Sequence, residues 1–515
     1  MTANMTRSTP RIVAALVGLL AGAAALAAWE LLAGLVDGIS SPIAAIGGLV
    51  IALQPPGAQQ FVVTVFGTAD KLALNIAVLM VALLGSAGLG LLSRRRVMLA
   101  EAGFAVAGAF AFAVSLRDPL NDWFPTLVAG AVSVGAAIWV LRRLTRIAQT
   151  STVAAAPEMP DWSRRRFIGT SVAVGVSALA AGTIGRVLLE RRAVAVADVP
   201  PVPVPVETAA PLPAGATLNV PGITPLVISN GDFYRIDTQL FTPHLTAADW
   251  KLTITGMVDH PLTLTYDELL AMPLHEEYIT IQCVSNEVGG DLVGNALWRG
   301  VRLNDALDRA GVQAGATQLV GRAFDDWTSG FPTAWLAGSD REALIAVAMN
   351  GEPLPPAHGY PARLMVPGLY GYVSATKWLT NIELTTLEAF DAYWIQLGWA
   401  KLGPIKTASR IDVPRADQNI VAGTLPVAGV AWAPDRGISK VELQVDNTAW
   451  MAAELSTPIS ASTWVQWLVR WNAPRGRHQL RVRATDGDGN VQVANVQPPA
   501  PSGATGYHTI SVQVT

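Results

Sequence analysis

The sequence contains a single cysteine, Cys283, in 515 residues. One cysteine excludes an intramolecular disulfide and any metal site built from several thiolates, such as a structural zinc site or an iron–sulfur cluster. Charged residues are also scarce, at 15% against 51% hydrophobic residues. That balance is too apolar for a purely soluble protein and indicates membrane segments. The net charge of −3 provides no basic surface for a polyanion, so we predict no nucleic-acid partner.

Histidine is absent from the apolar N-terminal part of the chain. All six histidines follow residue 190: His244, His260, His275, His358, His478 and His508. Haem b bound between membrane helices usually needs paired histidine ligands. The sequence therefore predicts no haem in this region.

The N-terminal part contains five apolar stretches of about 20 residues, the length that crosses the hydrocarbon core of a bilayer as a helix. They cover residues 11–36, 71–92, 97–116, 123–141 and 167–189. A further apolar stretch, residues 41–53, is shorter and ends at Pro55-Pro56, so we interpret it as interfacial or re-entrant. The pattern predicts a transmembrane bundle of about five helices over residues 1–192, in contact with membrane lipid.

The basic clusters fall on one side of this bundle if there are five crossings. The exception is Arg191-Arg192 after the fifth span, which we interpret as a snorkelling end. Clusters precede the first span, separate the second from the third, follow the fourth and precede the fifth: Arg7 and Arg11; Arg94 to Arg96; Arg142, Arg143 and Arg146; Arg164 to Arg166. The positive-inside bias then places the N-terminus in the cytoplasm. Everything after residue 189 is expected on the extracytoplasmic side of the cytoplasmic membrane.

The basic cluster before the fifth span has a second interpretation. Ser163-Arg164-Arg165-Arg166-Phe167 matches the twin-arginine export pattern, and an apolar helix follows it. That signal is read by a receptor and exports folded cargo, as a protein loaded with a cofactor before export would need. The alternative is a plain juxtamembrane basic cluster.

Three further segments follow the bundle. Residues 193–225 are rich in proline, which predicts an extended linker. Residues 226–408 mix short strands and helices without a repeating strand–helix unit, which predicts an α+β domain. Residues 409–515 alternate apolar and polar positions, as at Val441, Leu443 and Val445, which predicts an all-β immunoglobulin-like sandwich.

Cys283 ends an apolar strand and is followed by polar residues and glycines up to Gly290. A lone cysteine after such a strand is most often a small buried hydrophobe. The polar loop instead favours a ligand-facing position, where a thiolate could bind a soft or high-valent metal. A second group, His358, Arg363 and Lys377, suits an anionic phosphate ligand. Taken singly, Arg363 could be a structural ion pair and Lys377 a solvated surface charge.

The order and spacing of these motifs resemble the core of the sulfite oxidase family. The resemblance rests on residues 280–283, 294–301 and 350–355 leading into 358–363, and it extends from about 232 to 387. The tail after residue 409 resembles that family's immunoglobulin-like dimerisation domain. The resemblance implies a molybdenum–molybdopterin cofactor, an α+β cofactor-binding catalytic domain and a homodimer.

The resemblance also implies roles for particular residues. Cys283 would supply the protein thiolate to molybdenum. His358 and Arg363 would hold the pterin and its phosphate, and Ala375-Thr376-Lys377 would close over the cofactor. Tyr234 and Arg235 match a pterin- and substrate-facing motif, and Asp326 matches a cofactor-binding aspartate, with Asp325 as the alternative. Cys283, Arg235 and Asp326 are the expected catalytic residues.

The sequence departs from sulfite oxidases proper at several positions. Ile236-Asp237 stands where that family has Asn-His after the motif arginine. The loop before Lys377 lacks the family's arginine, and Trp327 lies nearest to the family's active-site tyrosine. We expect no cytochrome b5 domain, because no paired haem histidines flank the core. Since an oxyanion needs cationic recognition, these changes argue against sulfite as the substrate.

We therefore expect a membrane-anchored molybdenum oxidoreductase that performs two-electron oxygen-atom transfer on a small oxyanion or sulfoxide-type substrate. Its electrons would pass to or from an extracytoplasmic carrier or quinone. One alternative is a non-catalytic, membrane-displayed binding module with a degenerate core. Another is a transporting bundle regulated by the outer domain, although few ionisable residues in the spans offer a relay.

Overall fold

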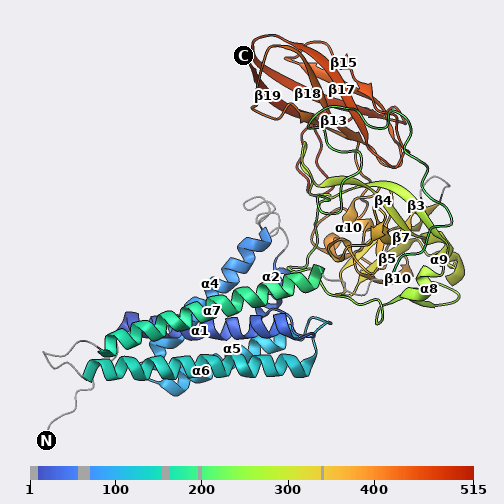
Figure 1. The fold of residues 1–515 in the computed structure, drawn as a ribbon. Helices are drawn as coiled ribbons and strands as arrows, with labels where there is room; N and C mark the ends of the chain where they lie inside the picture. Colours follow the sequence, from blue (N-terminus) through green and yellow to red (C-terminus); the bar gives the residue numbers. More distant parts are fainter. Residues whose placement is uncertain (1–9, 56–69, 154–161, 195–199, 338–341) are drawn as a thin grey trace, which may run out of the picture. The chain divides into compact units, whose positions relative to one another are not determined.

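The computed structural model describes residues 10–55, 70–153, 162–194, 200–337 and 342–515. The chain divides into two compact units, Met1–Ala195 with Thr238–Pro243, and Val196–Asp237 with His244–Thr515. Figure 1 shows the helices of the first unit and the strands of the second. Arg7 of the predicted orientation, the side chain of Arg164 in the export motif, and residues 195–199 of the predicted linker lie outside what the model describes.

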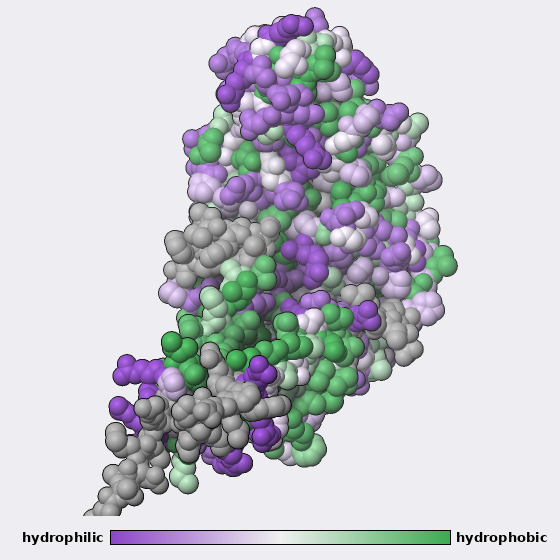
Figure 2. All heavy atoms as spheres, turned by 60° about the vertical axis from the view of Figure 1, so that its left-hand side comes forward, coloured by the Kyte–Doolittle hydropathy of each residue, from purple (hydrophilic) through white to green (hydrophobic). Residues whose placement is uncertain are grey.

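The first unit consists of long apolar helices. The helices in its described residues are α1 (Arg11–Leu35), α2 (Pro42–Leu53), α4 (Asp70–Ser93), α5 (Val97–Ser115), α6 (Trp123–Val153) and α7 (Trp162–Val194). Five of these, all but α2, are long and apolar enough to cross a membrane, which confirms the predicted helical bundle. Large hydrophobic side chains such as Val81, Leu84 and Leu179 are exposed on them, and Figure 2 shows hydrophobic residues spread over the visible helical surface.

Helix α1 packs against α4, α6 and α7. Glycines make the close approaches possible. A Cβ on Gly18 would lie 2.6 Å from the Cα of Gly90, and a Cβ on Gly185 would lie 2.3 Å from the carbonyl oxygen of Glu30. Small residues are the usual means of close helix packing in lipid, where the hydrophobic effect does not drive helices together.

From Pro200, where the description of the second unit begins, an irregular segment packs along the domains of that unit. Val206 donates its backbone N–H to Leu274 O at 2.8 Å, and Leu218 donates to Gln466 Oε1 at 2.7 Å. Ala216 and Val220 are buried. The proline-rich segment is therefore held by backbone hydrogen bonds and by burial of its apolar residues.

The α+β domain contains two sheets. The first has the order β2-β1-β10-β5-β6 and joins β1 (Lys251–Gly256), β2 (Leu262–Thr265), β5 (Gln318–Ala323), β6 (Thr328–Pro332) and β10 (Leu379–Thr385). Only the β1–β10 pair is parallel among its ladders. The second joins β3 (Leu274–Gln282), β4 (Val293–Arg302), β7 (Leu344–Met349), β8 (Glu352–Pro353) and β9 (Arg363–Met365). The mixed, non-repeating topology confirms the α+β prediction.

Short helices connect these strands. They are α8 (Tyr266–Leu270), α9 (Leu303–Ala310), α10 (Gly371–Ser374) and α11 (Tyr393–Gln396), with 3₁₀ turns η2 (Thr333–Leu336) and η3 (Pro356–His358). Helix α8 begins with a capping box, in which Thr265 and Glu268 bond to each other's backbone N–H groups. The loops after β3, after η3 and around α10 carry the predicted site residues.

The C-terminal domain is an all-β sandwich, as its alternating sequence predicts. One sheet joins β11 (Ala408–Val413), β13 (Gly423–Trp432), β17 (Val465–Ala473) and β16 (Glu454–Leu455). The other joins β12 (Asn419–Ile420), β19 (His508–Val514), β18 (Gly476–Asp486), β14 (Ile438–Val445) and β15 (Met451–Ala452). Val441, Leu443 and Val445 point into a core with Trp467 and Trp471. Inward apolar positions on both sheets bury each other, which stabilises the sandwich.

Candidate functional site

Cys283 follows the last residue of β3 and starts a tightly closed loop. Its backbone N–H donates to Leu292 O at 2.9 Å, and Asn286 Oδ1 accepts from Leu292 N at 2.8 Å. Cys283 is buried, with 9% of its surface exposed. Burial raises the pKa of the thiol, whereas hydrogen bonds from the backbone and hydroxyl of Ser285 and the charge of Lys377 lower it. Lys377 therefore lies within electrostatic reach of the sulfur.

His358 is buried in a defined, neutral tautomer. Its Nε2 lies 2.7 Å from Asn230 O, and a carbonyl can only accept, so Nε2 carries the proton. Burial lowers the pKa of His358 to about 4, and the charges of Arg363, Lys377 and Arg235 also lower it. Its other nitrogen, Nδ1, is buried without a hydrogen-bond partner among the described residues. His358 thus presents an unused acceptor inside the site.

Arg363 is a buried cation at the start of β9. Its Nη1 donates to His358 O at 3.2 Å, and its guanidinium lies 5.3 Å from the ring centre of Trp298. Burial lowers the pKa of Arg363 to about 10, although electrostatic interactions with Tyr234 and Asp237 act to raise it. Arg363 therefore stays protonated at neutral pH. Like His358 Nδ1, its Nε is buried and has no hydrogen-bond partner among the described residues.

Lys377 lies beside this pair. Its Nζ donates to Asp237 Oδ2 at 2.9 Å and to Ala357 O at 3.0 Å. Both members of the ion pair are almost fully buried, at 8% and 9% exposure. The next residue, Trp378, donates its backbone N–H to Gly359 O at 3.1 Å. These bonds join the loop after α10 to the loop that carries His358.

An aromatic cluster positions Tyr234 and Arg235. The ring of Phe233 stacks on Tyr234 at 5.3 Å and meets His358 edge-on at 5.7 Å. Phe233 lies against Gly294, where a Cβ would approach its ring to 2.7 Å. Burial and then the neighbouring Cys283 raise the pKa of the Tyr234 hydroxyl. Arg235 is exposed, although its charge reaches His358.

The remaining predicted residues lie toward the β5–β6 hairpin. The Thr376 hydroxyl is 2.7 Å from Ser329 Oγ on β6, so its side chain faces that hairpin. Ala375 is buried and closes the last turn of α10. Asp326 occupies the hairpin tip at φ 62°, and the hairpin meets the site where Phe324 donates to Trp378 O at 3.1 Å.

The structure thus brings Cys283, Tyr234, His358, Arg363 and Lys377 together, with Arg235 at the edge. Two residues that bond to the site residues are not among those predicted from the sequence: Asp237, which pairs with Lys377, and Asn230, which accepts from His358. In the sequence, Asp237 stands out only as a departure from a family motif, and no motif contains Asn230. Asp237 and Lys377 are 140 positions apart, and no local pattern links an acid and a base at that separation.

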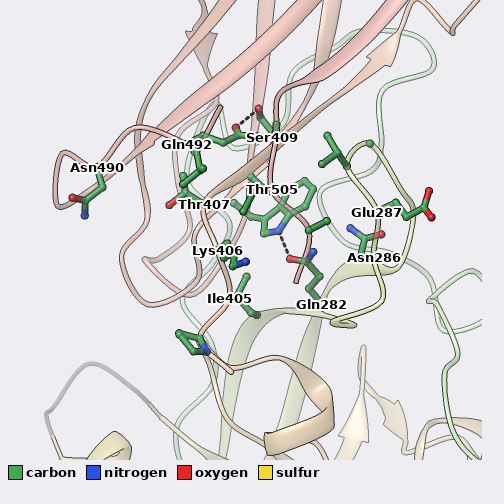
Figure 3. A pocket seen from close by; sticks show the side chains of 18 of the residues that line it. Gln282, Asn286, Glu287, Ile405, Lys406, Thr407, Ser409, Asn490, Gln492 and Thr505 are labelled. Carbon is green, nitrogen blue, oxygen red and sulfur yellow. Dashed lines mark hydrogen bonds between the residues drawn. The ribbon is translucent and has the colours of Figure 1, made fainter. Parts of the chain in front are cut away.

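A separate cavity of about 290 Å³ is lined in part by the loop that follows Cys283. It is lined by Gln282, Asn286, Lys406, Arg436 and Gln492, among others. Figure 3 shows the Gln282 side chain turned toward the sandwich, where its Oε1 accepts from Trp432 Nε1 at 2.7 Å. Ser409 and Gln492 are bonded at 2.7 Å on the other wall. The cavity includes none of the predicted cofactor residues.

The donor set around Cys283 fits the predicted molybdopterin. A buried thiol, a neutral imidazole acceptor and a buried guanidinium donor converge on one place. Two unpartnered buried polar atoms, His358 Nδ1 and Arg363 Nε, would be costly unless a ligand satisfied them. A phosphate oxygen would accept a hydrogen bond from the guanidinium, and a pterin N–H would donate one to the imidazole.

Comparison with known proteins agrees with this geometry. Residues 239–394 match the family described as oxidoreductase molybdopterin binding domain. Mitochondrial sulfite oxidase of Homo sapiens is 26% identical over 324 residues, which cover 54% of this chain and 59% of that enzyme. The uncharacterized oxidoreductase YuiH of Bacillus subtilis (strain 168) is 37% identical over 155 residues, which cover 30% of this chain and 74% of that protein.

The sulfane dehydrogenase SoxCD from Paracoccus pantotrophus has a similar fold. The alignment has a TM-score of 0.50 and 21% identity and covers 56% of this chain and 82% of that one. The fold and site define a molybdopterin-binding oxidoreductase. The chain belongs to the sulfite oxidase family, and it spans about three fifths of the length of the human enzyme. Membership in this family of enzymes favours the oxidoreductase over the binding-module alternative.

Proposed function

We propose that this protein is a membrane-anchored molybdenum-cofactor oxidoreductase that carries out two-electron oxygen-atom transfer. The observation that carries the proposal is the pair of unpartnered buried atoms, His358 Nδ1 and Arg363 Nε, close to a buried thiol. A protein gains nothing in stability from burying an unsatisfied guanidinium nitrogen. Such atoms are expected where a ligand completes the hydrogen bonds.

The proposal assigns a role to each residue of the cofactor site. Cys283 supplies the thiolate that ligates the metal, and the hydrogen bonds from Ser285 favour that thiolate against the cost of burial. Arg363 donates to the phosphate, while neutral His358 accepts a hydrogen bond from the pterin. Tyr234 and Arg235 lie toward the substrate. Asp326, Ala375, Thr376 and Lys377 enclose the cofactor. When bound, the molybdenum centre supplies the two-electron oxygen-atom chemistry.

The substrate we propose is a small oxyanion or sulfoxide-type molecule, and electrons pass to or from an external carrier or quinone. The arginine clusters support a cytoplasmic N-terminus and an extracytoplasmic catalytic domain. The twin-arginine-like motif before Phe167 supports export of folded, cofactor-loaded protein. The sandwich would pair two copies into a homodimer.

Metal analysis of Cys283→Ser tests the proposal. The wild type, purified from a host that makes molybdopterin, should contain about one molybdenum per chain, and the variant should lose its activity with redox dyes. Ser439→Ala in the exposed part of the sandwich is the matched control and should behave as wild type. Thermal melting establishes that the variant is folded. Full molybdenum content and activity in folded Cys283→Ser would refute the site, and a wild type without molybdenum would refute the enzyme.

A further inference from the structure

The ion pair between Asp237 and Lys377 places an acid inside a site otherwise rich in positive charge. The carboxylate oxygen and the ammonium nitrogen are 2.9 Å apart, and both side chains are more than nine-tenths buried. Screening by water is weak at such a position, so each charge strongly offsets the other. Two of the three N–H donors of Lys377 are used by Asp237 and Ala357.

The carboxylate of Asp237 acts on a second cation as well. Its charge favours the protonated form of Arg363, the buried arginine beside His358. His358 itself is neutral, because burial and nearby cations lower its pKa to about 4. The positive charge around His358 therefore comes from Arg235, Arg363 and Lys377, and Asp237 offsets part of it.

We propose that Asp237 is a specificity-determining residue, which engages Lys377 and thereby makes the site prefer an uncharged sulfur–oxygen substrate over an oxyanion. The inference rests on the proposed function and narrows its substrate class. Recognition of a dianion needs uncompensated cations aimed at it. Arg363 is assigned to the cofactor phosphate, and Lys377 is engaged by Asp237. Arg235 lies toward the substrate but is exposed, so water and salt screen its charge. A neutral sulfur–oxygen group needs only a hydrogen-bond donor.

Two unreactive probes of similar shape separate charge from size: inorganic sulfate, a dianion, and dimethyl sulfone, which is uncharged. Their dissociation constants are measured by calorimetry on full-length, molybdenum-loaded protein. Asp237→Asn keeps the shape of the side chain and an oxygen for Lys377 but removes the charge. We expect sulfate to bind about tenfold more tightly to this variant, or about 1.4 kcal/mol. Dimethyl sulfone should bind within about twofold of the wild type.

Glu276→Gln is the matched control. It removes the charge from another largely buried ion pair, to Arg299 at 2.7 Å, on β3. Neither probe should change its affinity for this variant. An equal change for both probes, or no change for sulfate in Asp237→Asn, would overturn the inference.

Two further measurements keep the test decisive. If Asp237→Asn does not fold, the wild type provides the answer, because sulfate should bind it no more tightly than dimethyl sulfone does. Sulfate bound tenfold more tightly than the sulfone by the wild type contradicts the inference. The molybdenum content of the wild type is determined separately, so that failure of the proposed function can be told apart from failure of the specificity assignment.

Discussion

Gly359 lies directly against Lys377. A Cβ on Gly359 would stand 3.0 Å from the Cα of Lys377 and 3.3 Å from the Cβ of Arg363, and the glycine has φ +116°. Both the backbone angle and the lack of space require glycine at this position. The close approach joins the loop that carries His358 to the loop that carries Lys377, and so fixes the relative positions of the proposed cofactor ligands.

Gly359→Ala should therefore damage the site as well as the fold. Strain and the displaced neighbour should cost about 2–3 kcal/mol of stability, with reduced molybdenum content. Melting temperature and metal analysis measure the two effects. Gly351→Ala is the control, because Gly351 also has a positive φ but nothing lies within 4 Å of its Cβ position. It should lose about 1 kcal/mol and keep its metal. Equal metal loss in both variants would contradict the explanation.

Arg363→Met should separate stability from cofactor binding. The variant removes a buried cation with an unpartnered Nε, so protein from a host that lacks the cofactor should melt at the same temperature as wild type or higher. In a cofactor-producing host, molybdenum content should fall about tenfold or more. Arg322→Met, which breaks the partly exposed ion pair with Glu383, should leave the content unchanged. Normal molybdenum content in Arg363→Met would remove this residue from the site.

Glu277 should make the second unit less stable as pH rises. Burial, Glu342 and Glu207 raise the pKa of Glu277 from 4.5 to about 7. Between these two values the folded protein binds more protons than the unfolded chain, so its stability falls as pH increases. Glu277→Gln should therefore stabilise the protein at pH 8 by about 1–2 kcal/mol, after allowance for partial exposure, and by little at pH 5.

Melting temperatures of purified protein at pH 5 and pH 8 test this expectation. Asp308→Asn, on the exposed face of α9, should shift the melting temperature equally at both pH values. A gain for Glu277→Gln that is larger at pH 5 would show that the sign is wrong.

Gly185→Leu should disrupt the helical unit. A Cβ at residue 185 would lie 2.3 Å from Glu30 O and 2.6 Å from Leu31 N, so the larger side chain forces α1 and α7 apart. We expect lower yield and a lower melting temperature in detergent. Gly169→Leu in the same helix has nothing within 4 Å of its Cβ position and should be tolerated. Equal behaviour of the two variants would argue against this helix contact.

The sequence alone determined the features that depend on local pattern. Five long apolar stretches predicted the helices, because only about 20 apolar residues span a bilayer. Alternation at Val441, Leu443 and Val445 predicted the sandwich, because neighbouring side chains on a strand point to opposite faces. The motifs around Cys283, His358 and Arg363 indicated the cofactor site, because their residue types and order are specific.

Tertiary structure decided which of these side chains meet and in what charge state. The neutral tautomer of His358 depends on a carbonyl 128 positions away, at Asn230. The pairing of Lys377 with Asp237 joins segments that are 140 positions apart. Hydrogen bonds, burial and electrostatic coupling depend on distance in space, and local sequence patterns do not specify such distances. For that reason the cofactor could be predicted from sequence, whereas the charge balance that we propose selects the substrate became visible only in the folded chain.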